Sequence, residues 1–191
     1  MEEKENAKAK GYYEALQVFI KNILLMMLLF TFVFRLSVVR GHSMLPSLQE
    51  QDLLLVVSRP LCGEFQPGDI VVLQKTSLQL NQIIKRVIAT EGQVVDIDFG
   101  TGTVYVDGQR LQEDYVNEPT YREEGMEFPL RVPEGSVFVM GDNRNHSTDS
   151  RDARLGTVDV RYIAGKAKIL LFPGASEETG RRDFGRIGGV D

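Results

Sequence analysis

The segment Gln82–Ala89 reads QIIKRVIA and predicts the fold class of the chain. Successive side chains of a β-strand point to opposite faces, so Lys85 shares one face with Ile83 and Val87, while two isoleucines flank the arginine on the other face. A run that is apolar on both faces is typical of a strand covered on both sides of its sheet. The segment therefore predicts a buried strand in a protein that is mainly β.

The chain after residue 50 continues as short strands and turns. Turn sequences such as Pro67-Gly68 separate runs rich in Val, Ile and Leu, and Asp107-Gly108 has the signature of a two-residue hairpin turn. The polar residues 113–131 predict an excursion outside the core, and the glycine-rich residues 174–191 predict a mobile tail. The other expected strands are Asp52–Ser58, Asp69–Gln74, Gln93–Ile97, Thr103–Val106, Ser136–Met140 and Ile163–Phe172.

An apolar segment precedes the β-rich part. Ile23–Phe34 reads ILLMMLLFTFVF, and its extension back to Val18 gives 17 residues, or roughly 25 Å of helix against a bilayer core of about 30 Å. A snorkelling Lys21 and the apolar residues before Val18 supply the remaining length. No polar face repeats at helical spacing, which favours a transmembrane anchor, residues 15–35, over a buried core helix.

The charges around this anchor predict its orientation. Four basic residues precede the apolar run and two follow it, which favours a cytoplasmic N-terminal segment, residues 1–14, and an extracytoplasmic domain. A cleaved secretory signal peptide is the alternative, but it needs small residues at an A-x-A-like site, and the run is followed by RLSVVR at 35–40. We therefore expect a single-pass protein of the cell membrane, with the lipid bilayer as a partner.

Composition excludes several classes of protein. The 191 residues are 42% hydrophobic and 26% charged, which excludes wholesale disorder and predicts one folded domain. The formal charge is −5, and the residues after 40 carry 16 basic and 23 acidic side chains, so we expect no nucleic-acid partner. One cysteine and two histidines exclude an internal disulfide and multi-cysteine metal sites, and we expect no metal and no cofactor.

Two polar positions offer a nucleophile and a base. Ser43 stands in GHSMLPSL at 41–48, nine positions after Phe34, and so lies at most roughly 30 Å from the end of the anchor. Burial of Lys85 in an apolar strand disfavours its ammonium form and lowers its pKa, and a neutral amine can take a proton from a serine hydroxyl. For Lys85 alone, an edge-strand lysine that discourages aggregation is the alternative.

A third polar cluster, GDNRNHSTDSR at 141–151, follows an apolar run and predicts a shaped loop. A surface turn or a calcium loop is the alternative, although the terminal Glu of an EF-hand loop is absent. His146 could serve Ser43 as a base in a conventional triad, with an aspartate of this loop orienting it. His42 is adjacent to Ser43, so their side chains diverge in extended chain. Cys62, in PLCG at 60–63, reads as an unactivated turn residue.

These clusters, in this order behind an anchor, resemble type I signal peptidases, the membrane-bound Ser–Lys proteases of bacteria, over roughly residues 15–173. The anchor and the small domain are similar to the compact forms of Gram-positive bacteria. The resemblance implies a mainly β fold: a single N-terminal transmembrane helix, then a β-rich signal-peptidase/LexA-like catalytic domain over residues 36–173. The motifs that carry it are Ser43-Met44-x-Pro46-x-Leu48, GDIV at 68–71, IKRV at 84–87 with Glu91-Gly92, and GDNR at 141–144 with Ser147-x-Asp149-Ser150-Arg151.

The resemblance also implies a role for each matching residue. Ser43 would be the nucleophile, its backbone N–H would donate to the oxyanion, and Lys85 would be the general base. Ser147 would orient the lysine amine through its hydroxyl, which does not restore the charge of the amine. The residues that match the supporting ion pair and the turn into this loop are Asp149 with Arg151, and Asp142 with Asn143.

The chain departs from some relatives in two places. Certain members have a serine two positions before the nucleophile that helps to hold the oxyanion, and here that position is Gly41. The stretch after Arg151, DARLG at 152–156, is longer than in members where the glycine follows sooner.

The resemblance implies that the substrates are signal peptides of exported preproteins, bound as an added strand beside the Lys85 strand and cut after small residues at A-x-A-like sites. It implies encounters with the protein-export machinery. The residues expected to line the substrate pockets are Val39, Gly41, Met44, Leu48, Ile83 and Ile84.

Three other functions compete with this one. A sortase-like transpeptidase also combines an anchor with a β-rich domain, but it needs an activated cysteine, and Cys62 lies in an unsuitable setting. A LexA-like self-cleaving repressor shares the Ser–Lys chemistry but requires a helical DNA-binding domain. An inert anchored β module has no use for a serine, a lysine and a helper serine together.

Overall fold

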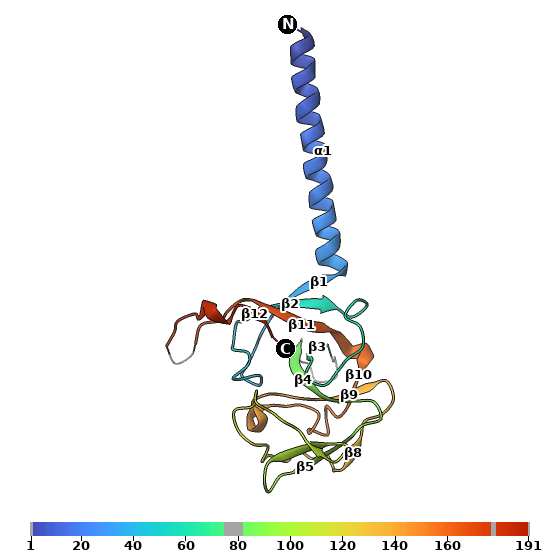
Figure 1. Cartoon of the computed structure of the whole chain (residues 1–191), viewed down its shortest axis with the longest axis vertical. Helices are drawn as coiled ribbons and strands as arrows, with labels where there is room; N and C mark the ends of the chain where they lie inside the picture. Colours follow the sequence, from blue (N-terminus) through green and yellow to red (C-terminus); the bar gives the residue numbers. More distant parts are fainter. Residues whose placement is uncertain (1, 75–81, 177–178, 191) are drawn as a thin grey trace. The chain divides into compact units, whose positions relative to one another are not determined.

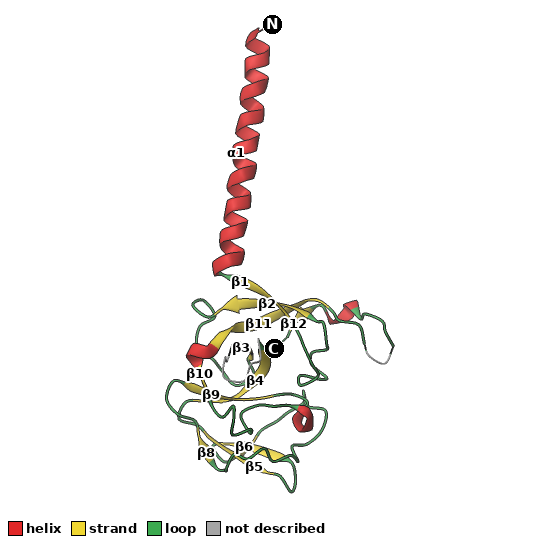
Figure 2. Cartoon of the chain, turned by 180° about the vertical axis from the view of Figure 1, so that it is seen from behind, coloured by secondary structure: helices red, strands yellow, loops and turns green. Residues whose placement is uncertain are grey.

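The computed structural model describes residues 2–74, 82–176 and 179–190, and predictions for the remaining residues lie outside this part. The chain forms two compact units, Met1–Arg35 and Leu36–Asp191. The first unit is the helix α1, Glu2–Phe32, in Figures 1 and 2. Its 23 residues Lys10–Phe32 are long and apolar enough to cross a membrane. The helix ends at Phe32 rather than at residue 35, because the following residues enter a strand.

The second unit is built of two antiparallel sheets (Figures 1 and 2). The larger has the strand order β1-β2-β11-β3-β4-β9-β10, with β12 paired to β11, and the smaller has the order β7-β6-β5-β8. The strands of the larger sheet are β1 Phe34–Val38, β2 Leu53–Ser58, β3 Ile70–Leu73, β4 Ile83–Thr90, β9 Ser136–Met140, β10 Val158–Asp159, β11 Ile163–Phe172 and β12 Gly188–Gly189. Those of the smaller are β5 Val94–Asp98, β6 Thr103–Val106, β7 Gln109–Arg110 and β8 Leu130–Arg131.

Strand β4 lies between β3 and β9, as its apolar sequence predicts. All of its residues between the two ends are buried. Lys85 is opposite Val71 of β3, and Val87 is opposite Val139 of β9. The lysine is 2% exposed, which excludes the edge-strand role.

The seven strands expected from the sequence are all present, with bounds that differ by one residue at most. The Asp107-Gly108 hairpin is also confirmed: both residues have positive φ, and β6 pairs with β7 around them. The expectation that residues 113–131 stay outside the core is wrong at their C-terminal end. Phe128 stacks edge-on against Phe138, and Leu130 packs against the core between the sheets, because burial of these two apolar side chains outweighs the polar character of their neighbours.

The C-terminal tail makes contacts that its composition does not suggest, while its mobility remains a prediction. Gly188 and Gly189 pair with β11, and Val190 packs against the core cluster that contains Met44 and Leu48. Arg186, at the end of a 3-10 turn, Phe184–Arg186, forms an ion pair with the buried Asp52. These are tertiary contacts with distant residues, which the composition of the tail does not reveal.

Candidate active site

Ser43 and Lys85 meet at the centre of the site. Lys85 Nζ lies 2.6 Å from Ser43 Oγ, within hydrogen-bond distance, and it also donates to the carbonyl oxygen of Ile84 at 3.1 Å. The serine comes from the loop before β2 and the lysine from β4. At this distance a neutral lysine amine can accept the serine proton directly.

The environment of Lys85 favours that neutral form. Burial lowers the pKa of Lys85 from 10.5 to about 8, since an ammonium ion loses its hydration there. The nearby carboxylates of Asp149 and Asp142 oppose this effect and Arg151 adds to it. Desolvation is the largest of these influences, so the amine is poised to act as a base near neutral pH.

The loop that carries Ser43, Val39–Asp52, is held at its ends and from within; we call it the Ser43 loop. Its ends are joined by the Val39 N–H, which donates to the Asp52 carbonyl at 2.8 Å. Met44 and Leu48 are 1% and 0% exposed and anchor the loop in the core. Both residues therefore support the loop, and their contact with a substrate side chain remains a prediction.

Asn143 connects this loop to the loop 141–151. Its backbone N–H donates to the Ser43 carbonyl and its side-chain amide donates to the His42 carbonyl, both at 3.0 Å. Gly141 lies against the same carbonyl: a Cβ there would overlap the carbonyl oxygen of Ser43 and the hydroxyl of Ser147. Only glycine at position 141 permits this approach.

The expected Asp149–Arg151 ion pair is present and fully buried. Arg151 Nε lies 2.9 Å from one carboxylate oxygen of Asp149, and its terminal nitrogen lies 2.8 Å from the other. Asp149 also accepts from the Gly141 N–H at 2.9 Å, and Arg151 donates to the Arg144 carbonyl at 2.6 Å. The pair thus fixes the backbone of the loop at Gly141 and at Arg144.

Ser147 does not make the hydrogen bond expected of a helper serine. Its side chain is buried beside Gly141, yet within the described residues its Oγ has no hydrogen-bond partner. A buried hydroxyl without a partner is unfavourable. Its role as a helper to Lys85 remains a prediction.

Asp142 has a partner that the sequence did not single out. Arg86, next to Lys85 on β4 and on the opposite face, binds both carboxylate oxygens of Asp142 at 2.9 and 2.8 Å. Its guanidinium group also donates to the Gly68 carbonyl and stacks over the ring of Tyr115 at 4.1 Å. Arg86 therefore ties the strand that carries Lys85 to the loop that positions Ser43.

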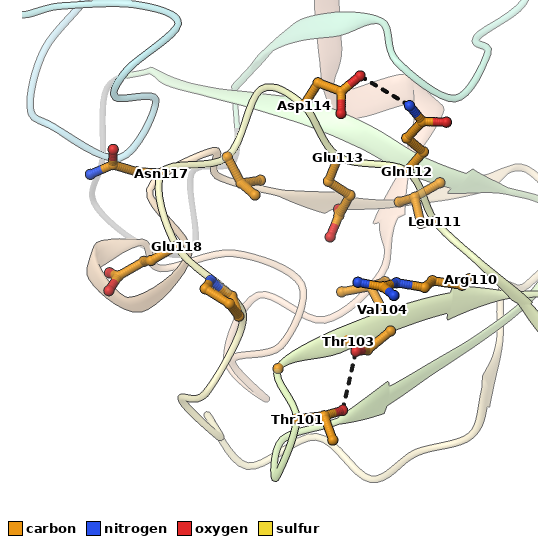
Figure 3. Close-up of a pocket in the computed structure, with 13 residues that line it drawn as sticks. Thr101, Thr103, Val104, Arg110, Leu111, Gln112, Glu113, Asp114, Asn117 and Glu118 are labelled. Atoms are coloured by element: carbon orange, nitrogen blue, oxygen red, sulfur yellow. Dashed lines mark hydrogen bonds between the residues drawn. The ribbon is translucent and has the colours of Figure 1, made fainter.

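Arg144 is a second supporting residue that sequence reasoning missed. It is fully buried, donates to the Gly141 carbonyl at 3.1 Å, and is paired with Glu113. Glu113 lines a cavity of about 590 Å³ between β6 and the segment 111–119 (Figure 3). The cavity lining contains neither Ser43 nor Lys85, so this cavity is separate from the Ser–Lys pair.

The other residues expected to contact substrate differ in accessibility. Gly41 is exposed, with a φ of 80°, and its N–H donates to the Glu50 carboxylate, which removes this N–H from an oxyanion site. Ile83 is half-buried, whereas Val39 and Ile84 belong to the core. Oxyanion binding by the Ser43 N–H remains a prediction.

The alternative catalytic groups have less suitable settings. His146 is exposed at the end of a 3-10 turn, Arg144–His146, whereas the Ser43 hydroxyl lies against Lys85. Cys62 is a half-buried free thiol whose sulfur donates to the Arg59 carbonyl. In the described part of the chain, no group of three or more Asp, Glu, His and Cys side chains is placed to hold a metal ion.

The chain is similar to known proteins over most of its length. Residues 12–172 match the family described as signal peptidase, peptidase S26. The signal peptidase I of Bacillus licheniformis is 34% identical over 180 residues, covering 90% of this chain and 95% of that protein. A probable signal peptidase I-1 of Synechocystis is 41% identical over 162 residues, covering 79% and 78%. A crystal structure of a signal peptidase I from Enterococcus faecalis covers 55% of this chain and 97% of that one, with 31% identity and a TM-score of 0.46.

Proposed function

Because this chain belongs to the signal peptidase family, peptidase S26, and is a serine endopeptidase of the signal peptidase I type, we propose that Ser43 and Lys85 are its catalytic residues. The observation that carries this proposal is the 2.6 Å separation between the serine hydroxyl and the buried amine of low pKa.

Ser43 would act as the nucleophile and Lys85 as the general base and acid. As Ser43 Oγ attacks the scissile carbonyl carbon, its proton passes to Lys85 Nζ. Collapse of the tetrahedral intermediate breaks the C–N bond, and the ammonium of Lys85 returns the proton to the leaving amine. A water molecule, deprotonated by the same amine, then attacks the acyl-enzyme, and its proton returns to Ser43 as the new carboxyl product leaves.

The substrates would be signal peptides of exported preproteins, bound as an extended strand. The pairing of β4 supports this mode: β9 pairs with β4 only from Arg86 to Thr90 in the described residues, which leaves Ile83–Lys85 without a strand on that side. An added peptide strand there would lie beside Lys85. We further propose that cleavage follows small residues at A-x-A-like sites, because the sequence motifs resemble those of type I signal peptidases.

The N-terminal helix would place the enzyme in the cell membrane. Lys10–Phe32 has the length and composition of a membrane span. The excess of basic residues before the apolar run favours a cytoplasmic N-terminus and a catalytic domain on the outer side, where exported preproteins meet it alongside the export machinery.

Cleavage of a preprotein by the detergent-solubilised chain tests the catalytic residues. Wild type should yield a product of mature size, and Ser43→Ala and Lys85→Ala should yield none. Cys62→Ala and His146→Ala are matched controls that should cleave like wild type. Unchanged cleavage by Lys85→Ala would refute the Ser–Lys pair, and loss of activity in either control would favour a sortase-like cysteine or a histidine base.

A further inference from the structure

The residues after 172, which lie outside the match to the family, form hydrogen bonds with the Ser43 loop. Two of its groups reach the carboxylate of Asp52, which is fully buried. The Gly174 N–H donates to one oxygen at 2.6 Å. The guanidinium of Arg186 donates to both oxygens, at 3.1 and 2.7 Å. Such bidentate, charge-assisted contacts are the stronger kind of hydrogen bond.

Asp52 is also hydrogen-bonded to the backbone of the loop, so the contacts of the tail restrain that backbone. Its second carboxylate oxygen also accepts from the Gln49 N–H at 2.8 Å, and its own carbonyl accepts from Val39 at the other end of the loop. Arg186 donates in addition to the Ser47 carbonyl at 3.2 Å. One arginine of the tail therefore holds the loop at two places on the C-terminal side of Ser43.

Gly174 holds the loop at a third place, and there the contact is between two backbones. A Cβ at residue 174 would overlap the carbonyl oxygen of Glu50, so only glycine allows the tail to approach this closely. The carboxylate of Glu50 in turn accepts from the Gly41 N–H, two residues before Ser43. The contacts of the tail thus reach both sides of the serine.

We propose that Gly174 and Arg186 are positioning residues, which hold the Ser43 loop through Asp52 so that the serine stays within reach of Lys85. We call these three residues the C-terminal clasp. The proposal rests on Ser43 as the nucleophile. Its physical basis is that a displacement of about 1 Å at a reacting group can cost roughly 100-fold in rate. Asn143 fixes the backbone at Ser43 itself, and the clasp adds bonds at Ser47, Gln49 and Asp52 on the C-terminal side of the loop.

Point variants of the full-length, detergent-solubilised chain test the clasp. Arg186→Ala should lower kcat for a preprotein-derived peptide about tenfold, with KM changed less than about twofold, because the nucleophile is displaced while the peptide-binding edge of β4 is intact. Arg186→Lys should restore part of the loss, since its ammonium can still pair with Asp52. Arg181→Ala, which changes an exposed arginine of the same segment, is the matched control and should behave as wild type.

Amide hydrogen exchange supplies a readout that does not depend on catalysis. In Arg186→Ala the amides of Leu48 and Gln49 should exchange faster, while those of Ser136–Met140 stay at the wild-type rate. Gly174→Ala should loosen the same amides. Unchanged loop exchange, or equal acceleration throughout the domain with kcat per folded enzyme unchanged, would refute the clasp. If Ser43→Ala still cleaved the peptide, the proposed nucleophile would fail, whereas the loop exchange would still decide whether the clasp exists.

Discussion

Changing the pH tests the role of Lys85 without changing the protein. Only the neutral amine can accept the Ser43 proton, so kcat/KM should follow the fraction of Lys85 that is deprotonated in the unliganded enzyme. Burial lowers the pKa of this lysine to about 8. The rate should therefore rise through the neutral range and level off on the alkaline side.

The size of the rise follows from this value. With a pKa of about 8, roughly 9% of the amine is neutral at pH 7 and roughly 91% at pH 9, so kcat/KM should increase about tenfold over this interval. A lysine at its ordinary pKa of 10.5 would give an increase of about 100-fold over the same interval, with no plateau. A histidine base, with a pKa of about 6.5, would give an increase of only about 1.3-fold.

The assay is initial-rate cleavage of a fluorogenic signal-peptide analogue at concentrations well below KM, with the full-length chain in detergent between pH 6 and pH 10. Wild type and His146→Ala should give the same profile. A profile that is already flat at pH 7 would refute Lys85 as the base, and one that still rises steeply at pH 10 would refute the lowered pKa of the lysine.

Three further variants test the buried groups of the site. Gly141→Ala should reduce kcat by about 100-fold in the same assay, because its new Cβ displaces the Ser43 carbonyl, and wild-type activity would contradict the proposed packing. Asp142→Asn should leave buried Arg86 without its counter-charge and lower the free energy of unfolding by about 3 kcal/mol in denaturant titrations. It should also move the midpoint of the pH profile to lower pH, because Asp142 raises the pKa of Lys85, and an alkaline shift would contradict this. Burial lowers the pKa of Lys85 below its unfolded value, so the stability of the folded chain rises as the pH increases from about 8 to 10.5. Below pH 8 the buried ammonium is destabilising, so Lys85→Met should be inactive but about 3 kcal/mol more stable than wild type at pH 7 by calorimetry. An equal or lower melting temperature would contradict this.

The longer strands could be predicted from the sequence because each is defined by its own residues. β4 and β9 are rich in Val, Ile, Phe and Met, as buried strands are. The two-residue strands, such as β8 and β12, have no such pattern, since the partner strand alone determines them. The same reason explains the tail: Arg186 reads as a solvated charge until the fold brings it to Asp52.

The proximity of Ser43 and Lys85 could be predicted because both residues stand in motifs that resemble those of a known family. Arg86 and Arg144 could not, because an arginine in a sequence reads as an exposed charge. In the folded domain their burial is offset by carboxylates of Asp142 and Glu113, which lie far from them in the chain. The burial of Met44 in the core could not be read from the sequence, because apolar character alone does not distinguish a pocket wall from the core; its contact with substrate remains a prediction.

The contacts that assemble the site join residues that are widely separated in the chain. Ser43 and Lys85 are 42 positions apart, Asn143 and His42 are 101 apart, and Arg186 and Asp52 are 134 apart. Contacts of such long sequence separation form late in folding, since each must first overcome the entropy of closing a large loop. A partly folded chain in which Ser43 has not yet met Lys85 would therefore lack the proposed catalytic pair, so the proposed activity would arise with the tertiary fold and not with the individual strands.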